Sequence, residues 1–466
     1  MEADRKERAA RLSALMEHIK EQEAFNGVIL VADQGIPLLC EAMGNAEFGK
    51  DGLRPLTTDS MFELASVSKP ITALGIIRLQ QLGQLDWDEP VSRWLPELPY
   101  PGITVRHLLS HTSGLPDYIE LFSKKWNPAH CAVNSDVVDM LVVHTPASLF
   151  APNDSWMYSN TGYIILAILI ERISGQSYAS FLSEQIFQPL GMTRTRVYNR
   201  RLDPGPVPKD YAWGYVYRLE RGGYVLPDDV PELSYVHYLD GLQGDGMVNS
   251  TVEDLLRLDR ALYDDNFINP QLREVMFAPV QLNNGEYFDY GFGWLIEQHL
   301  QLGKVMWHNG GWPGYAALFK RYVDHDATLI LLQNGEREIG YTEHLVQSIE
   351  QILAGEPVEA PQPAVLRKIV PHSAEEFEPY PGRYRFSDEP GKSLIVEVYV
   401  KHSQLYVRLD NGMILLLLPI GNGRFYEQQT ATELEFVGIE SGKSSQLIWY
   451  DRESRNVADR IQEYPV

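Results

Sequence analysis

The sequence has little cysteine, no long hydrophobic run and a shortage of positive charge. Only two of its 466 residues are cysteines, Cys40 and Cys131, and they lie far apart. A chain of this size does not depend on a disulfide scaffold, so we expect two reduced thiols and no cysteine nucleophile. The longest apolar stretches, residues 163–170 and 413–420, are much shorter than a bilayer span.

The charge balance excludes two classes of partner. The chain carries 63 acidic and 40 basic side chains, a formal net charge of −23. Nucleic acids and anionic membranes repel such a protein, so we expect neither as a partner. The segment Met1–Arg8 is charged and is not followed by the apolar core of a secretory signal, which predicts a cytoplasmic protein.

One short segment gives the first chemical signal. Ser66-Val67-Ser68-Lys69 places a hydroxyl and an amine on one face at the start of a predicted helix. A serine hydroxyl becomes a nucleophile when a neighbouring base takes its proton, and a lysine amine held neutral by burial can be that base. Because the motif is short, an ordinary serine cap beside a surface lysine is the alternative.

Two further segments suit the same chemistry. Tyr158-Ser159-Asn160 precedes an apolar helix and offers a phenol that can relay a proton and an amide that can hold a carbonyl. Trp307-His308-Asn309-Gly310-Gly311 lies beside a predicted strand, and its glycines can expose N–H groups to a developing oxyanion. For each segment taken alone, a structural turn is the alternative.

In this order, the S-x-x-K, Y-x-N and H-x-G segments resemble those of the serine hydrolases related to class C β-lactamases, penicillin-binding DD-peptidases, D-aminopeptidases and certain esterases. Four further stretches resemble the same family, and the likeness spans roughly residues 25 to 335. These stretches are 62–65, 103–116, 244–255 and 290–294. The resemblance implies an α+β or α/β fold of the β-lactamase/transpeptidase type. In it, an antiparallel sheet with flanking helices accompanies a helical lobe.

The resemblance also implies catalytic roles. Ser66 would be the nucleophile, and Lys69 and Tyr158 its proton-handling partners. Either a neutral Lys69 or a Tyr158 phenolate sustained by the Lys69 ammonium could be the base.

The remaining site residues would bind the substrate. Asn160 would position the scissile group, and His308 with Gly310 would form the far wall. The N–H groups of Ser66 and Gly311 would make the oxyanion hole.

One departure from the family pattern bears on the substrate. Class C β-lactamases generally carry K-T-G where this chain has His308-Asn309-Gly310. A lysine is a fixed cation suited to a substrate carboxylate, whereas a histidine is mostly neutral near pH 7. The substitution disfavours a dedicated β-lactamase or D-Ala-D-Ala carboxypeptidase. The H-x-G pattern is similar to that of D-aminopeptidases and esterase-like members.

Periodicity predicts the elements around these motifs. Apolar spacing indicates helices at the N-terminus, near the three motifs and at the end of the first domain, and alternation indicates a hairpin with several later strands. Ser250 with Glu253 predicts a capping box. The expected helices cover 12–19, 66–84, 136–143, 161–174, 177–187, 251–263 and 345–353, and the expected strands cover 27–32, 36–42, 291–297, 315–323 and 327–334.

The C-terminal part has a different character. Residues 356–376 contain four prolines and predict a semi-rigid linker between a catalytic domain, 1–355, and a second domain, 377–466. Short alternating strands, such as 405–409 before the turn Asp410-Asn411-Gly412, predict a small all-β barrel. Residues 380–384 resemble the lipocalin-like domains appended to some family members. Such a domain can bind a ligand, cover the site or assemble a homo-oligomer; a stabilising cap is the favoured alternative.

Other polar clusters predict no cofactor or metal. His107 and His111 are spaced like a zinc pair, but they run from a helix into a loop and we expect a structural role. The sequence therefore predicts a serine hydrolase that forms an acyl-enzyme on small amides, esters or short, D-configured peptides. A catalytically silent binding or scaffolding protein and a weak class C-type β-lactamase are the alternatives.

Overall fold

The protein is described here from a computed structural model. It describes residues 2–49, 52–203, 205–335, 338–363, 367–389, 392–409, 414–428, 430–450 and 454–461. The chain forms two compact units, which we describe separately. The first comprises Met1–Val216, Val225–Glu336 and Gln351–Pro357, and the second comprises Tyr217–Tyr224, Arg337–Glu350 and Val358–Val466.

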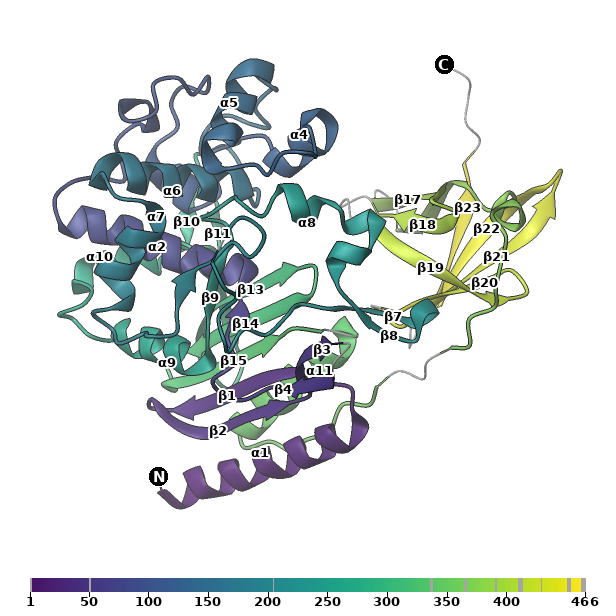
Figure 1. Ribbon diagram of the computed structural model, residues 1–466, viewed down its shortest axis with the longest axis horizontal. Coiled ribbons are helices and arrows are strands. Elements are labelled where there is room, and N and C mark those ends of the chain that lie inside the picture. Colours follow the sequence, from purple (N-terminus) through teal and green to yellow (C-terminus); the bar gives the residue numbers. More distant parts are fainter. Residues whose placement is uncertain are drawn as a thin grey trace. The chain divides into compact units, whose positions relative to one another are not determined.

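The first unit is built around a six-stranded antiparallel sheet with the order β12-β13-β14-β15-β1-β2 (Figure 1). The predicted N-terminal hairpin pairs with the last strand, from Gly27 opposite Gln333 to Asp33 opposite Ala327. Every residue of β1 and β15 is buried, as expected for strands at the centre of a covered sheet. The bounds are β1 Gly27–Asp33, β2 Ile36–Met43, β12 Leu295–His299, β13 Gly303–Trp312, β14 Tyr315–Tyr322 and β15 Ala327–Gln333.

Helices make up most of the middle of this unit. They are joined by loops that carry the second motif and several of the site's supporting residues. The α-helices among the described residues are α1 Glu2–Gln22, α2 Ser68–Gln81, α3 Val105–Leu109, α4 Tyr118–Lys125, α5 Asn134–His144, α6 Asn160–Ser174, α7 Tyr178–Leu182, α8 Tyr235–Tyr238, α9 Val252–Ala261, α10 Pro270–Met276 and α11 Ile339–Leu353.

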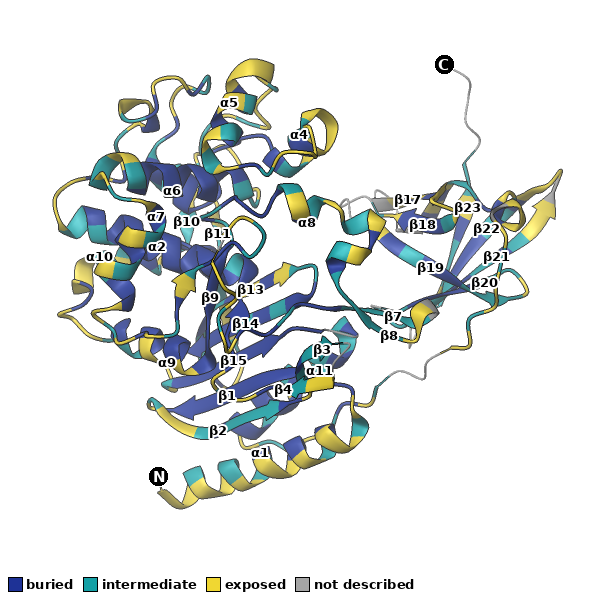
Figure 2. Cartoon of the chain, viewed as in Figure 1, coloured by how far each residue is buried: buried dark blue, intermediate teal, exposed yellow. Residues whose placement is uncertain are grey.

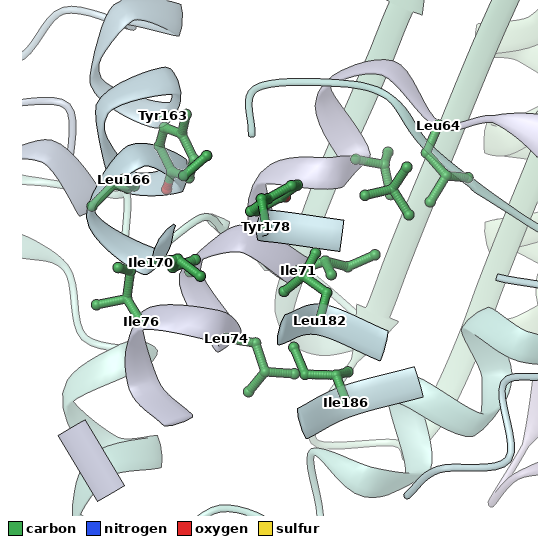
Figure 3. Close-up of a cluster of buried hydrophobic side chains, with 14 of the residues drawn as sticks. Leu64, Ile71, Leu74, Ile76, Tyr163, Leu166, Ile170, Tyr178, Leu182 and Ile186 are labelled. Carbon is green, nitrogen blue, oxygen red and sulfur yellow. The ribbon is translucent and has the colours of Figure 1, made fainter. Parts of the chain in front are cut away.

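Helix α2 is the buried centre of this helical region. It packs against α6 and α7, and Figure 3 shows its Ile71, Leu74 and Ile76 among side chains of the two neighbours. At Gly75 the approach is so close that a Cβ atom would lie 2.9 Å from Ile170 Cδ1. Side chains at such a crossing are fixed by packing on every side. The helix that carries Lys69 is therefore a rigid platform.

Small sheets surround this core. The sheet β5-β9-β6 leads directly into the first motif, and three two-stranded sheets lie elsewhere in the chain. The short strands are β3 Asn45–Gly49, β4 Gly52–Pro55, β5 Phe62–Glu63, β6 Arg196–Val197, β7 Val216–Arg218, β8 Gly223–Val225, β9 Val248–Ser250, β10 Val280–Gln281 and β11 Tyr287–Phe288.

The second unit contains a closed eight-stranded barrel, so the predicted barrel is confirmed. Alternate residues of its strands, such as Leu405 with Val407 and Leu415 with Leu417, form one apolar core (Figure 2). Its strands are β16 Gly382–Glu389, β17 Lys392–Lys401, β18 Gln404–Arg408, β19 Ile414–Gly421, β20 Arg424–Glu427, β21 Thr432–Glu440, β22 Lys443–Tyr450 and β23 Arg455–Arg460. The predicted turn Asp410–Gly412 lies outside the described residues.

A hairpin from the middle of the sequence also belongs to this second unit. Its residues are 217–224, in β7, β8 and the turn between them. The side chain of Gln428 donates to the Tyr217 carbonyl at 2.5 Å and accepts from the Leu219 N–H at 3.1 Å. One glutamine thus satisfies two backbone groups of a segment about two hundred residues earlier in the chain.

The fold class predicted from the sequence is confirmed, with two local corrections. The cap of α9 is Thr251, which accepts from the Asp254 N–H at 3.3 Å, and not the predicted Ser250. The strand expected at 291–297 is displaced to Leu295–His299, because Gly291 forms a turn with Trp294. Among the described residues, no helix combines the length and apolarity needed to cross a bilayer.

Candidate active site

The backbone around Ser66 is shaped by the small sheet before it. Strand β5 pairs with β9, and the Leu64 N–H donates to the Val248 carbonyl at 2.8 Å. Ala65 then adopts a left-handed conformation with φ of +45°, which costs energy for a residue with a Cβ atom. Ser66 follows in a single 3-10 turn before α2, and not in the α-helix itself as the sequence predicted. This kink presents Ser66, which is half-buried, at the start of α2.

Lys69 is wholly buried, and its amine is surrounded by three polar groups. Its Nζ lies 3.0 Å from Ser66 Oγ, 2.8 Å from Asn160 Oδ1 and 3.0 Å from the Asp245 carbonyl oxygen. An ammonium group has three N–H donors, and here each one meets an acceptor. The sequence placed Ser66, Lys69 and Asn160 in one site, and the structure brings them together.

Tyr158 stands over the same amine. Lys69 Nζ lies 4.8 Å from the centroid of the Tyr158 ring. The chain on both sides of Tyr158 is held by His111: the Met157 N–H donates to its carbonyl and the Ser159 N–H donates to its ring Nδ1, both at 3.0 Å. The imidazole also packs against the phenol ring, with centroids 4.4 Å apart.

Asn160 is oriented by the start of α6. Ser159 caps this helix by accepting the Gly162 N–H at 3.1 Å, so Asn160 is the first helical residue. Its side chain then points back to Lys69.

His308 lies on β13 itself, whereas its segment was predicted to lie beside a strand. Its ring is buried, and both nitrogens have partners within the protein. Nδ1 lies 2.6 Å from the Asn309 carbonyl oxygen and Nε2 lies 3.2 Å from Tyr290 Oη. Burial, followed by the nearby charge of Lys69, lowers the pKa of His308 to about 3. The imidazole is therefore neutral at physiological pH.

The two glycines of this strand differ sharply. A Cβ atom on Gly310 would lie 2.2 Å from the Leu64 carbonyl oxygen and 2.9 Å from the Ser66 nitrogen. A Cβ atom on Gly311 would meet nothing within 4 Å, and Gly311 is exposed. Gly310 thus permits contact between β13 and the Ser66 backbone, and the next residue faces open space.

A carboxyl group lies close to Lys69. The Tyr118 hydroxyl donates to Asp245 Oδ2 at 2.9 Å, and the backbone carbonyl of Asp245 accepts from Lys69. Burial raises the pKa of the Asp245 carboxyl, and the Lys69 charge opposes this effect.

The residues that support the site were not predicted from the sequence. His111 was assigned to a structural loop, and neither Tyr290 nor Asp245 was given a role, although all three lie in stretches that carried the family resemblance. His107 instead accepts the Thr104 N–H at the start of α3. Among the described residues, no three His, Cys, Asp or Glu side chains are grouped so that they could hold a metal ion.

Comparisons with known proteins agree with this geometry. The family model "Beta-lactamase" matches residues 12–354. Penicillin-binding protein 4* of Bacillus subtilis (strain 168) is 44% identical over 440 residues, which cover 94% of this chain and 96% of that protein. Esterase EstB of Burkholderia gladioli is 36% identical over 200 residues, covering 40% of this chain and 50% of the esterase.

A solved structure with a small-molecule ligand also resembles the chain. It is the D-amino acid amidase of Ochrobactrum anthropi SV3 in complex with L-phenylalanine amide. The match has a TM-score of 0.56 and 27% identity, and it covers 70% of this chain and 90% of the amidase.

Proposed function

This chain belongs to the beta-lactamase family, and from that premise we propose that it is a serine hydrolase acting on small amides or esters through an acyl-enzyme on Ser66. The observation that carries the proposal is the position of the fully buried Lys69 amine, 3.0 Å from Ser66 Oγ. A buried lysine without a charged partner at hydrogen-bond distance is expensive for a protein to keep. Activation of an adjacent nucleophile is the function that accounts for it.

Acylation begins with attack of Ser66 Oγ on the substrate carbonyl carbon. The three acceptors around Lys69 Nζ suit an ammonium, which leaves the Tyr158 oxygen, as phenolate, to take the Ser66 proton. This proton then passes to the leaving amine or alcohol as the carbonyl–heteroatom bond breaks. In the second step, water attacks the carbonyl carbon of the ester on Ser66 and gives a proton to Tyr158. The bond between this carbon and Ser66 Oγ breaks, Oγ takes the proton from Tyr158, and the acid product leaves.

An oxyanion develops on the carbonyl oxygen in both steps. We assign the Ser66 and Gly311 N–H groups as its donors, because Gly310 abuts the Ser66 nitrogen and Gly311 faces open space. Donors fixed in place before the reaction stabilise such a charge at little reorganisation cost. Asn160 holds the scissile group, and His308 with Gly310 forms the far wall.

The third motif narrows the substrate class. His308 is neutral and both of its ring nitrogens are engaged, so it offers no cation to a substrate carboxylate. We therefore favour uncharged amides and esters over β-lactams and peptides that end in D-Ala-D-Ala. The amidase and esterase among the relatives support this choice.

Covalent labelling tests the proposal directly. A fluorophosphonate probe should label the wild-type protein at one serine, and Ser66→Ala should abolish labelling while Ser68→Ala does not. A panel of chromogenic D- and L-aminoacyl anilides, short-chain esters and a cephalosporin then ranks the substrates. Absence of labelling, together with no turnover across the panel, would favour a silent binding protein and contradict the proposal.

A further inference from the structure

Three buried side chains, all without exposed surface or nearly so, connect the second motif to the third. Tyr290 Oη lies between two imidazoles, 3.0 Å from His111 Nε2 and 3.2 Å from His308 Nε2. At the outer ends, His111 Nδ1 meets the Ser159 N–H and His308 Nδ1 meets the Asn309 carbonyl. Four hydrogen bonds therefore run in series from the loop before α6 to strand β13.

The two ends of this series fix the position of every proton. The Asn309 carbonyl can only accept, so His308 carries its proton on Nδ1 and its Nε2 accepts from the Tyr290 hydroxyl. The Ser159 N–H can only donate, so His111 Nδ1 is unprotonated. The proton of His111 is then on Nε2 and is donated to Tyr290 Oη. No other arrangement of neutral rings satisfies all four contacts.

Both rings stay neutral at physiological pH. Burial and the Lys69 charge lower the pKa of His308 to about 3, and the same two causes lower the pKa of His111 well below its ordinary value. Protonation of His111 would also place a proton on Nδ1, facing the N–H donor of Ser159. The direction of the series of hydrogen bonds is therefore constant near physiological pH.

We propose that His111 is a positioning residue for Tyr158, and that Tyr290 and His308 hold it in the tautomer this task requires. His111 binds the N–H of Met157 and of Ser159, the two neighbours of Tyr158, and its ring packs 4.4 Å from the phenol. The backbone carbonyl of His111 holds Met157 and the Nδ1 lone pair of its ring holds Ser159, so this residue fixes the loop on both sides of Tyr158. The inference rests on the proposed role of Tyr158 as the group that handles the Ser66 proton.

Such fixation matters because proton transfer requires close alignment. A displacement of about 1 Å can cost on the order of a hundredfold in rate. The left-handed backbone of His111, with φ of +61°, is a strained conformation that the surrounding contacts maintain. The position is thus retained at a cost in stability, as expected of a residue that serves the site.

Two matched variants separate the two ends of the His111 ring. His111→Asn places an amide oxygen near the former Nδ1, so it can still accept from Ser159 but cannot reach Tyr290. His111→Gln can reach Tyr290 but leaves the Ser159 N–H without an acceptor. We expect kcat for an activated ester to fall about 30-fold in His111→Gln and less than about fivefold in His111→Asn, with KM nearly unchanged. The loss of kcat in Tyr290→Phe should lie between the losses in these two variants.

A double-mutant cycle distinguishes positioning from a general structural defect. If His111 acts through Tyr158, His111→Gln should cost less than about threefold in a Tyr158→Phe background. Equal losses in both backgrounds, or no loss in the wild-type background, would overturn the inference.

A second measurement does not depend on turnover. Long-range 1H–15N spectra of histidine-labelled protein should show His111 protonated on Nε2 and His308 protonated on Nδ1, both unchanged between about pH 5.5 and 8. The opposite tautomer at either ring would overturn the proposed direction of the hydrogen bonds. Failure of Ser66 labelling would instead refute the proposed function. The spectroscopic result would then decide by itself whether the series of hydrogen bonds has the proposed direction.

Discussion

The surroundings of Ser66 and the interior of the barrel use burial in opposite ways. Around Ser66 the buried groups are polar: Lys69, His111 and His308 are almost completely covered and linked by hydrogen bonds. The barrel core is apolar, with aliphatic and aromatic side chains such as Phe425 and Phe436. Apolar burial stabilises a fold, whereas polar burial costs free energy that only partners within the protein offset.

Backbone strain follows the same division. In the barrel, non-glycine residues with positive φ lie in turns between strands, such as Asn422 and Ser441. The first unit also has such residues in turns, for example Gln34 and Asp326. In addition, Ala65 and His111 carry this strain beside Ser66 and Tyr158, the proposed catalytic groups, and the barrel has no described counterpart to that arrangement.

Removal of the buried amine should give the largest effect. Lys69→Ala is expected to lower kcat for ester hydrolysis at least about a thousandfold, because Ser66 loses the group that lies beside its hydroxyl. Lys125→Ala, at an exposed position in α4, is the matched control and should leave kcat unchanged. If the Ser66→Ala/Lys69→Ala double variant were far less active than either single variant, the two residues would not form one catalytic unit.

The glycine pair of β13 provides the next test. Gly310→Ala should lower kcat about a hundredfold, because the new methyl group would collide with the backbone at Leu64 and Ser66. Gly311→Ala is the matched control: its methyl group meets open space, and we expect a smaller loss. Measurements of kcat check the difference, with melting temperatures recorded to show that both variants are folded. Equal losses of kcat in the two variants would contradict the close contact between Gly310 and the Ser66 backbone.

The neutral His308 should make stability depend on pH. Its folded pKa, about 3, lies below the unfolded value of 6.5, so the contribution is complete above pH 6.5 and declines as the pH falls toward 3. At pH 5 the loss is about 2 kcal/mol. His308→Asn, which keeps a donor for the Asn309 carbonyl, should therefore lose less unfolding free energy between pH 7.5 and 5. Denaturant titrations at both pH values measure this, with the exposed His144→Asn as control.

Deletion of the barrel should have the smallest effect on chemistry. A protein that ends after residue 355 is expected to melt cooperatively and to keep its esterase kcat within about threefold, since every group of the site belongs to the first unit. Calorimetry and kinetics check this. A broad, non-cooperative transition would show that the predicted linker at 356–376 does not separate two independent domains. Self-association through the barrel stays a prediction, and it should disappear in the shortened protein.

Most of the site could be predicted from sequence because its residues lie in short ordered motifs. The order of Ser66, Tyr158 and His308 was enough to expect that they meet. Two local details were wrong. Thr251 caps α9 in place of its neighbour Ser250, and residues 308–311, which were expected beside a strand, lie within β13. Strand β14 pairs with residues 305–312 of β13, and β12 pairs with residues 303–307; the local sequence does not reveal these partners.

The hydrogen bonds that join His111, Tyr290 and His308 could not be predicted from the sequence. His111 and Tyr290 are separated by 179 positions, and nothing in their own segments indicates that one hydroxyl will join two imidazoles. A histidine followed by Thr-Ser-Gly is typical of a turn, and that interpretation hid the role of its ring. The barrel was easier to predict from the sequence, because regular strand spacing and alternating side chains are properties of each segment alone.

The two hydrogen bonds of Gln428 to the hairpin at 217–224 have a consequence for the design of chimeras. A chimera that exchanged only the C-terminal barrel between relatives would remove the side-chain partner of the Tyr217 carbonyl and the Leu219 N–H. A successful chimera would need to carry the eight residues of the hairpin along with the barrel, or restore a glutamine at the equivalent place. The second unit of this protein is thus discontinuous in sequence, although it is compact in space.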